Sequence, residues 1–223
     1  MLGTAAEGRL YQRLRLTRPP ELGYARPGQY VAMLPCAAIG QVGARYFVLA
    51  SEVDESEYIE FIIKKEGDTA LLLTALAAGA EVALTAAQGA GFAVERAAGR
   101  ELVCFASGSG IAGIIPLVAW VTGQPSLQVR RVWVYYGETA STDFAFDAEL
   151  TAMRARGVEV ALSSANDPET TAGRRFVQEA FAAHGPELTE ATVIICGSSK
   201  MQQSIEALMA SRGLDPTEAL RNY

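Results

Sequence analysis

The stretch that decides the fold is LVCFASGSGIAGIIP, residues 102–116. Its apolar start, 102–106, predicts a buried strand, and the apolar residues after the glycines predict a helix that ends near Val121. Between them Gly108, Gly110 and Gly113 form a G-x-G-x-x-G pattern in a strand–turn–helix context. Glycines let the backbone approach a pyrophosphate, and a helix start offers unpaired N–H groups and a positive dipole end. The stretch therefore predicts a nucleotide-binding turn, with a tight turn that binds nothing as the alternative.

Downstream of this stretch, strands and helices alternate. Apolar runs at 131–136, 158–162 and 191–196 predict strands, and the segments 143–156, 170–183 and 200–212 predict helices. Strands of near-continuous hydrophobicity, each followed by a helix, indicate a parallel sheet that is covered on both faces.

Upstream, the sequence pattern changes to short strands separated by turn residues. We expect strands at 8–16, 29–34, 45–50, 58–63, 81–84 and 91–94. A single helix is expected at 69–78, with Asp68 or Thr69 as its N-cap and Gly79 at its end. Six strands with one helix predict a small antiparallel barrel. The domains are predicted at 1–98 and 99–223.

Composition narrows the function classes. A net charge of −6 without a basic cluster argues against nucleic acid as a partner. No apolar run reaches the roughly 18 residues of a membrane helix, and the first residues lack the pattern of a signal peptide. The three cysteines are dispersed, and His184 is the only histidine, which argues against a disulfide framework, an iron–sulfur cluster or a metal site. We expect a reduced, cytoplasmic protein.

Three further places can bind a ligand. The segment Gly67-Asp68-Thr69 starts the barrel's helix with a hydroxyl, and Arg45 leads a strand, where its planar guanidinium can clamp a phosphate. Cys196 and Gly197 end the last strand, at the sheet edge where open α/β sheets bind ligands. Each has an ordinary alternative: a helix cap, a surface arginine or an inert buried thiol.

Seven motifs, in this order along nearly the whole chain, resemble the ferredoxin–NADP reductase superfamily. They are RPGQYV at 26–31, RYFVLAS at 45–51, KEGDT at 65–69, QGAGF at 88–92, GSGIAGIIP at 108–116, YYG at 135–137, and Cys196-Gly197 with Met201. The resemblance implies a FAD-binding barrel followed by an NAD(P)-binding domain, with hydride passing between nicotinamide and flavin.

The resemblance also assigns roles to single residues. It places Arg45, Gly67 and Thr69 at the flavin pyrophosphate, and Phe47 and Val48 beside the flavin ring. It places Gly108, Ser109 and Gly110 at the phosphates of NAD(P)H, with Cys196 and Gly197 beside the nicotinamide and Tyr223 stacked near the isoalloxazine. Because the chain lacks the cysteines of an iron–sulfur cluster, the electron acceptor is expected to be a separate protein or a small molecule.

The chain departs from the family pattern in the flavin signature. Phe47 stands where the family has Tyr, and Val48 where it has Ser, so a hydroxyl near the flavin is lost at both positions. An alternative reading is therefore a non-catalytic nucleotide-binding or regulatory protein that retains the fold, and a third is a structural subunit. The choice between NADH and NADPH stays open, because the segment 163–166 offers hydroxyls without a cation, while Arg174 and Arg175 follow it.

Overall fold

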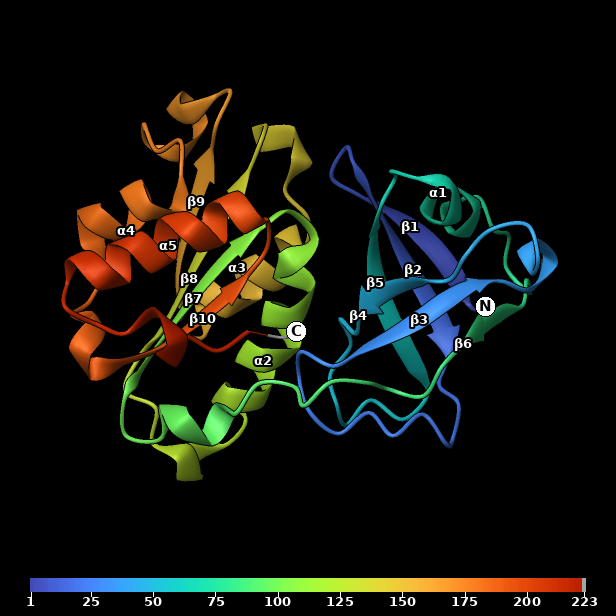
Figure 1. The fold of residues 1–223 in the computed structure, drawn as a ribbon, viewed down its shortest axis with the longest axis horizontal. Coiled ribbons are helices and arrows are strands. Elements are labelled where there is room, and N and C mark those ends of the chain that lie inside the picture. The colour runs from blue at the N-terminus through green and yellow to red at the C-terminus, as the bar shows by residue number, and fades with distance from the viewer. Residues whose placement is uncertain (222–223) are drawn as a thin grey trace.

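A computed structural model describes residues 1–221, which form two parts lying side by side (Figure 1). The N-terminal part contains six antiparallel strands in two three-stranded sheets, ordered β1-β2-β5 and β4-β3-β6. Their bounds are β1 Gly3–Glu7, β2 Tyr11–Thr17, β3 Tyr30–Pro35, β4 Arg45–Val48, β5 Tyr58–Lys64 and β6 Val82–Leu84, with α1 at Asp68–Thr74. The predicted six-stranded antiparallel barrel is confirmed.

The barrel core follows from alternation along the strands. In β3, Val31 and Met33 are fully buried while their neighbours are half-buried. They pack with Leu14 of β2, Phe61 of β5 and Leu73 of α1, so that the two sheets and the helix enclose one apolar interior.

One predicted barrel strand is absent, and one observed strand was not predicted. Residues 91–94 form no strand: Gly91 has φ +67°, and a Cβ there would lie 2.6 Å from the Cβ of Arg26, so the chain turns instead. Strand β1 was missed because its sequence, GTAAE, is mostly exposed and has no apolar alternation. It forms only because the hairpin aligns it with β2. The helix α1 is also shorter than predicted, ending at Thr74.

The C-terminal part is a four-stranded parallel sheet in the order β10-β7-β8-β9. The strands are β7 Glu101–Ser107, β8 Val132–Glu138, β9 Glu159–Ser164 and β10 Ala191–Cys196, and the helices are α2 Ile111–Thr122, α3 Asp147–Ala155, α4 Val177–His184 and α5 Ser199–Ser211. In β7, Cys104 and Ala106 pack toward α2, whereas Val103 and Phe105 pack toward α4 and α5. Helices therefore cover both faces of the sheet, as predicted (Figure 1).

The helix predicted at 170–183 begins only at Val177. Ala172 and Gly173 have φ of +55° and +80°, in the left-handed region, so the preceding residues cannot continue as a helix. The residues just before the helix, Arg175 and Phe176, line the cavity between the two parts.

The two parts share a buried apolar cluster and are also joined by polar contacts. Tyr11, Ile62 and Phe92 of the barrel belong to the same buried cluster as α2. Arg9 pairs with the fully buried Asp143 at 2.9 Å, and a carboxylate oxygen of Glu7 accepts a hydrogen bond from the Phe146 amide. The predicted boundary between residues 98 and 99 stays a prediction, and this core crosses it.

Candidate functional site

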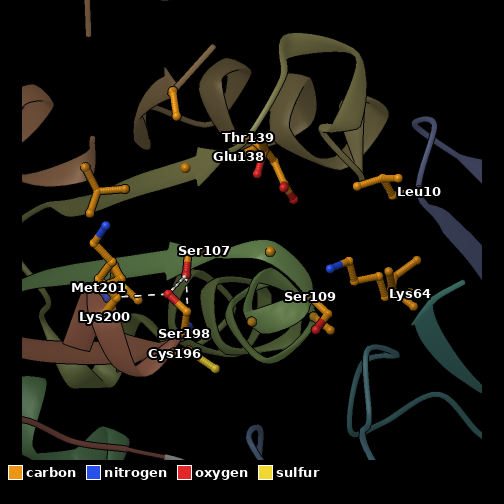
Figure 2. A pocket seen from close by; sticks show the side chains of 18 of the residues that line it. Leu10, Lys64, Ser107, Ser109, Glu138, Thr139, Cys196, Ser198, Lys200 and Met201 are labelled. Carbon is orange, nitrogen blue, oxygen red and sulfur yellow. Dashed lines mark hydrogen bonds between the residues drawn. The ribbon is translucent and has the colours of Figure 1, made fainter. Parts of the chain in front are cut away.

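A cavity of about 800 Å³ opens between the two parts, at the carboxyl ends of β7, β8 and β10 (Figure 2). Barrel residues form one wall: Leu10, Tyr11, Tyr46, Phe47, Val48, Ile62 and Lys64. The nucleotide-binding turn and the ends of the parallel strands form the other. Ligands of open α/β sheets bind in the crevice outside the carboxyl ends of the strands, so the cavity lies where such a site is expected.

The barrel wall is largely apolar. The side chains of Phe47 and Val48 line the cavity, as predicted, together with Tyr46. Phe47 also packs against the barrel core. Tyr46 is 69% exposed and contacts the ring of Tyr30 edge-to-face at 5.4 Å between centroids. This wall of rings and a branched side chain suits a planar aromatic ligand, and Tyr46 was missed because the resemblance assigned it no role.

The glycine turn faces this wall across the cavity. Residues Gly108–Gly110 form a 3-10 turn that runs into α2. A Cβ on Gly110 would lie 2.1 Å from the carbonyl oxygen of Cys196, so only glycine lets the turn pack against the end of β10. Within residues 1–221 no side chain caps the start of α2. The Ile111 N–H bonds back to the carbonyls of the turn, so the amides of the turn itself are the ones that suit an anion.

The end of β10 is held by serine contacts. Ser107 Oγ accepts a 3.0 Å hydrogen bond from the Ser198 amide, and Ser198 Oγ accepts from the Met201 amide and caps α5. Gly197, with φ +155°, lies against Ser107: a Cβ at Gly197 would be 2.3 Å from Ser107 Oγ. Only glycine, which has no Cβ, allows the chain to pass this close to Ser107 as it leaves β10 and lines the cavity.

Cys196 lines the cavity but is almost fully buried. Burial raises the pKa of its thiol to about 12. At neutral pH the group is a protonated thiol, so it is a weak nucleophile and an apolar contact surface.

Three predicted flavin residues lie on the barrel outside the cavity wall. Thr69 is buried, and its hydroxyl donates a 2.8 Å hydrogen bond to the Gly43 carbonyl, which ties the start of α1 to the segment before β4. Gly67 has φ +82° and precedes α1, and Arg45 is exposed and has no polar partner within residues 1–221. The three residues therefore form one locality, adjoining the wall through β4. The remaining predicted residue, Tyr223, lies outside the described residues.

The buried carboxylate of Glu138, which lines the cavity, was not predicted from the sequence. Glu138, at the end of β8, accepts hydrogen bonds on Oε1 from the phenols of Tyr11, at 2.8 Å, and Tyr136, at 2.7 Å. Burial raises the pKa of Glu138, and the tyrosine hydrogen bonds oppose the rise. The acidic residue that the glycine pattern predicts about 20 positions further on is absent, since residues 128–131 are QVRR. The signal that could have found Glu138 is its place at the end of the second parallel strand.

Three basic residues also line the cavity: Lys64 on the barrel, and Arg175 and Lys200 near the starts of α4 and α5. Lys64 forms an exposed ion pair with Glu66 at 2.5 Å. Figure 2 shows its ammonium group directed toward Ser109. The cavity therefore presents positive charge from both parts.

The residues fit the two cofactors that the resemblance implies. A flat apolar wall for an aromatic ring system faces a turn whose amides and small glycines suit a diphosphate. Arg45, exposed beside the wall, offers a second phosphate contact. Among residues 1–221 there is no group of three or more His, Cys, Asp or Glu side chains that could hold a metal ion. In the same range, no helix combines the length and the hydropathy needed to cross a membrane.

Comparison with known proteins agrees with this geometry. Residues 105–207 match the family described as an oxidoreductase NAD-binding domain. No curated protein matches the chain in sequence.

Solved structures match over almost the full length. A ferredoxin reductase in carbazole 1,9a-dioxygenase is 18% identical, with a TM-score of 0.83, 99% of this chain and 67% of that chain being covered. The flavohem-like FAD/NAD-binding domain of nitric oxide dioxygenase from Vibrio cholerae O1 biovar El Tor is 18% identical, with a TM-score of 0.82 and coverage of 98% and 94%. The cytochrome b5 reductase domain of Ulva prolifera nitrate reductase is 13% identical, with a TM-score of 0.83 and coverage of 99% and 94%. The chain therefore has the two-domain fold of these reductases, and its residues 105–207 match an oxidoreductase NAD-binding domain.

Proposed function

We propose that the chain is a flavin-dependent NAD(P)H oxidoreductase that passes hydride between the nicotinamide and FAD, and electrons onward to a separate acceptor. The observation that carries the proposal is that the apolar wall of β4 and the glycine turn before α2 face each other across one cavity. FAD, when bound, supplies the redox chemistry, taking up a hydride and releasing electrons singly or in pairs.

The protein's own residues bind and orient. The amides at Gly108, Ser109 and Gly110 and the start of α2 bind the diphosphate of the nucleotide. Phe47 and Val48, with Tyr46, hold the flavin ring. With both cofactors bound, the apolar wall would limit water around the two rings.

The sheet end at Cys196 and Gly197 positions the nicotinamide. Because burial keeps the Cys196 thiol protonated, we assign it a packing role beside the ring. Arg45, Gly67 and Thr69 are proposed at the flavin pyrophosphate: Arg45 through its guanidinium, and the other two through the backbone amides that open α1. Tyr223 stays a prediction as the residue that stacks near the flavin.

The acceptor is proposed to be a separate protein. Two of the similar structures are a ferredoxin reductase and a cytochrome P450 reductase from Amycolatopsis, and this chain covers 67% of each. We infer a protein acceptor for this chain from those two names. We infer from its acidic net charge that it does not bind nucleic acid. A cytoplasmic location stays a prediction.

The visible absorption spectrum of the purified protein tests the proposal. We expect a flavin spectrum that bleaches when NADH or NADPH is added without oxygen. A colourless protein that also fails to retain added FAD would contradict the flavin assignment.

A second candidate is a nucleotide-binding regulator that no longer binds flavin. It is favoured by the wall itself, where Phe47 and Val48 present no hydroxyl to a ligand. The double substitution F47Y/V48S distinguishes the two: if the flavin site is only weakened, flavin retention increases. If retention stays at zero while nucleotides still raise the melting temperature, the regulator is the better description.

A further inference from the structure

The carboxyl ends of β8 and β9 carry two carboxylates whose surroundings differ. Glu138 ends β8, one residue beyond the pair Ser107–Gly137 that aligns β8 with β7. It therefore lies directly beside the glycine turn that follows β7. Asp167 follows β9, the next strand in the sheet.

Glu138 is held in one orientation and directed into the cavity. Its Oε1 accepts both buried phenols, those of Tyr11 and Tyr136, so the carboxylate cannot rotate away without breaking two hydrogen bonds. Figure 2 shows its carboxylate end pointing into the cavity. A carboxylate has about four acceptor positions, so two bonds on one oxygen leave capacity for a ligand's hydroxyl donors.

Asp167 takes up the donors that a phosphate would need. The Ser141 amide donates to both of its oxygens at 2.9 Å, and the hydroxyls of Ser141 and Ser164 donate to it as well. These hydrogen bonds lower the pKa of Asp167, so it is ionised at neutral pH. The Ser164 hydroxyl at the end of β9 is therefore occupied by a negative charge from the chain itself, whereas the buried Ser163 hydroxyl has no hydrogen-bond partner within residues 1–221.

We propose that the cavity selects NADH over NADPH, with Glu138 accepting hydrogen bonds from the adenosine ribose hydroxyls and Asp167 excluding a 2′-phosphate. The inference rests on the proposed function and deepens it. With the diphosphate on the glycine turn, the adenosine half extends along the strand ends toward β8 and β9, where an acidic residue pairs with a ribose hydroxyl. A phosphate ester at the same place would add negative charge beside Glu138 and on the side of the sheet that carries Asp167, which is unfavourable.

Arg175 and Lys200 are the opposing consideration, since both line the cavity and a cation can bind a 2′-phosphate. We infer that both side chains bind the diphosphate instead. If they bind a 2′-phosphate, the wild-type protein prefers the phosphorylated ligand, and the proposal is wrong.

The test uses the full chain and ligands that need no redox chemistry. Melting temperatures are measured with ADP-ribose and with 2′-phospho-ADP-ribose for the wild type, E138Q, D167A and the control E159Q, whose carboxylate lies at the opposite end of β9. Initial rates with NADH and NADPH, using ferricyanide as acceptor, give kcat/KM in parallel. Unfolding without ligand confirms that each variant is folded.

We expect ADP-ribose to bind the wild type at least about tenfold more tightly than its 2′-phosphate. A site built to hydrogen-bond a hydroxyl group discriminates strongly against a ligand that lacks that hydroxyl. E138Q reduces that ratio about tenfold or more through weaker ADP-ribose binding. D167A reduces it by admitting the 2′-phosphate, and E159Q leaves it unchanged. An unchanged ratio in both E138Q and D167A overturns the inference. If ADP-ribose binds with the expected preference but neither coenzyme reduces a flavin, the selectivity stands and the proposed redox function fails.

Discussion

The phenol of Tyr11, on barrel strand β2, donates a 2.8 Å hydrogen bond to Glu138, on strand β8 of the nucleotide-binding part. Both residues are buried, and the bond lies in the cavity wall where the two parts meet. It is a polar bond to a buried carboxylate, so its loss leaves part of a buried charge unsatisfied.

Replacing Tyr11 with Phe is therefore expected to lower the free energy of unfolding by about 1–3 kcal/mol, the usual cost of removing a partner from a buried charged group. Urea titration measures this. Tyr30→Phe is the matched control, because the structure gives the Tyr30 hydroxyl no hydrogen bond within residues 1–221. Equal stability of the two variants would show that the Tyr11 bond contributes nothing.

The stability of Glu138→Gln relative to the wild type is expected to depend on pH. Burial raises the folded-state pKa of Glu138 above its unfolded value, so the folded protein binds this proton more tightly. That contribution is complete below the unfolded pKa of about 4.3 and is lost as pH rises through the folded pKa. The variant should therefore gain stability relative to wild type as the pH rises above about 4. A difference that stays constant as the pH rises, measured by urea unfolding at each pH, would contradict the raised pKa.

Gly110→Ala is expected to disrupt the turn before α2. The new Cβ would lie 2.1 Å from a backbone oxygen of Cys196, which cannot move as a side chain would. Overpacking of this kind typically costs about 1–3 kcal/mol, and the shifted turn should also lose nucleotide binding. Gly3→Ala is the control, since a Cβ there meets nothing within 4 Å. Calorimetry with and without ADP-ribose measures both effects.

Thr69→Ala tests whether this residue organises the flavin locality. The change removes the hydrogen bond to the Gly43 carbonyl and should cost about 1 kcal/mol of stability. If Arg45 and the start of α1 bind the flavin pyrophosphate, FAD retention falls too. Thr74→Ala removes a comparable bond within α1, to the Leu71 carbonyl, and should leave retention unchanged. Gel filtration followed by flavin fluorescence gives the retained fraction.

Tyr46→Ala separates ligand binding from folding. Because Tyr46 is 69% exposed, its loss should change the free energy of unfolding by no more than about 0.5 kcal/mol. If its ring covers the flavin, the dissociation constant for FAD should rise about tenfold. The exposed Leu2 provides the control, as Leu2→Ala. Unchanged FAD affinity in the Tyr46 variant would place the flavin ring elsewhere.

The parallel sheet could be predicted from sequence because its signal is local. Each strand is a continuous apolar run followed by a helix, so periodicity alone identifies it. The barrel was predicted less well: β1 is polar and depends on its hairpin partner, and Gly91 sets a turn where composition suggested a strand.

The site divides in the same way. The glycine turn and the end of β10 were predictable because motif and strand end coincide in the sequence. The Tyr11–Glu138 pair could not be predicted, because its members lie 127 residues apart and meet only when the two parts are docked. The hydrogen bond of the Thr69 hydroxyl could not be predicted either, since its acceptor is the backbone carbonyl of Gly43 on another segment.

The shared core has a consequence for how the protein folds and how it can be divided. Ile62 and Phe92 pack with α2, so a third buried cluster is shared between the two halves, beside the core that each has of its own. A segment cut to residues 105–207 would expose the apolar face of α2 to water and invite aggregation. We therefore expect a single cooperative transition on heating, in which barrel and sheet melt together. We therefore expect the segment that the sequence identifies, residues 105–207, to be smaller than the unit that folds.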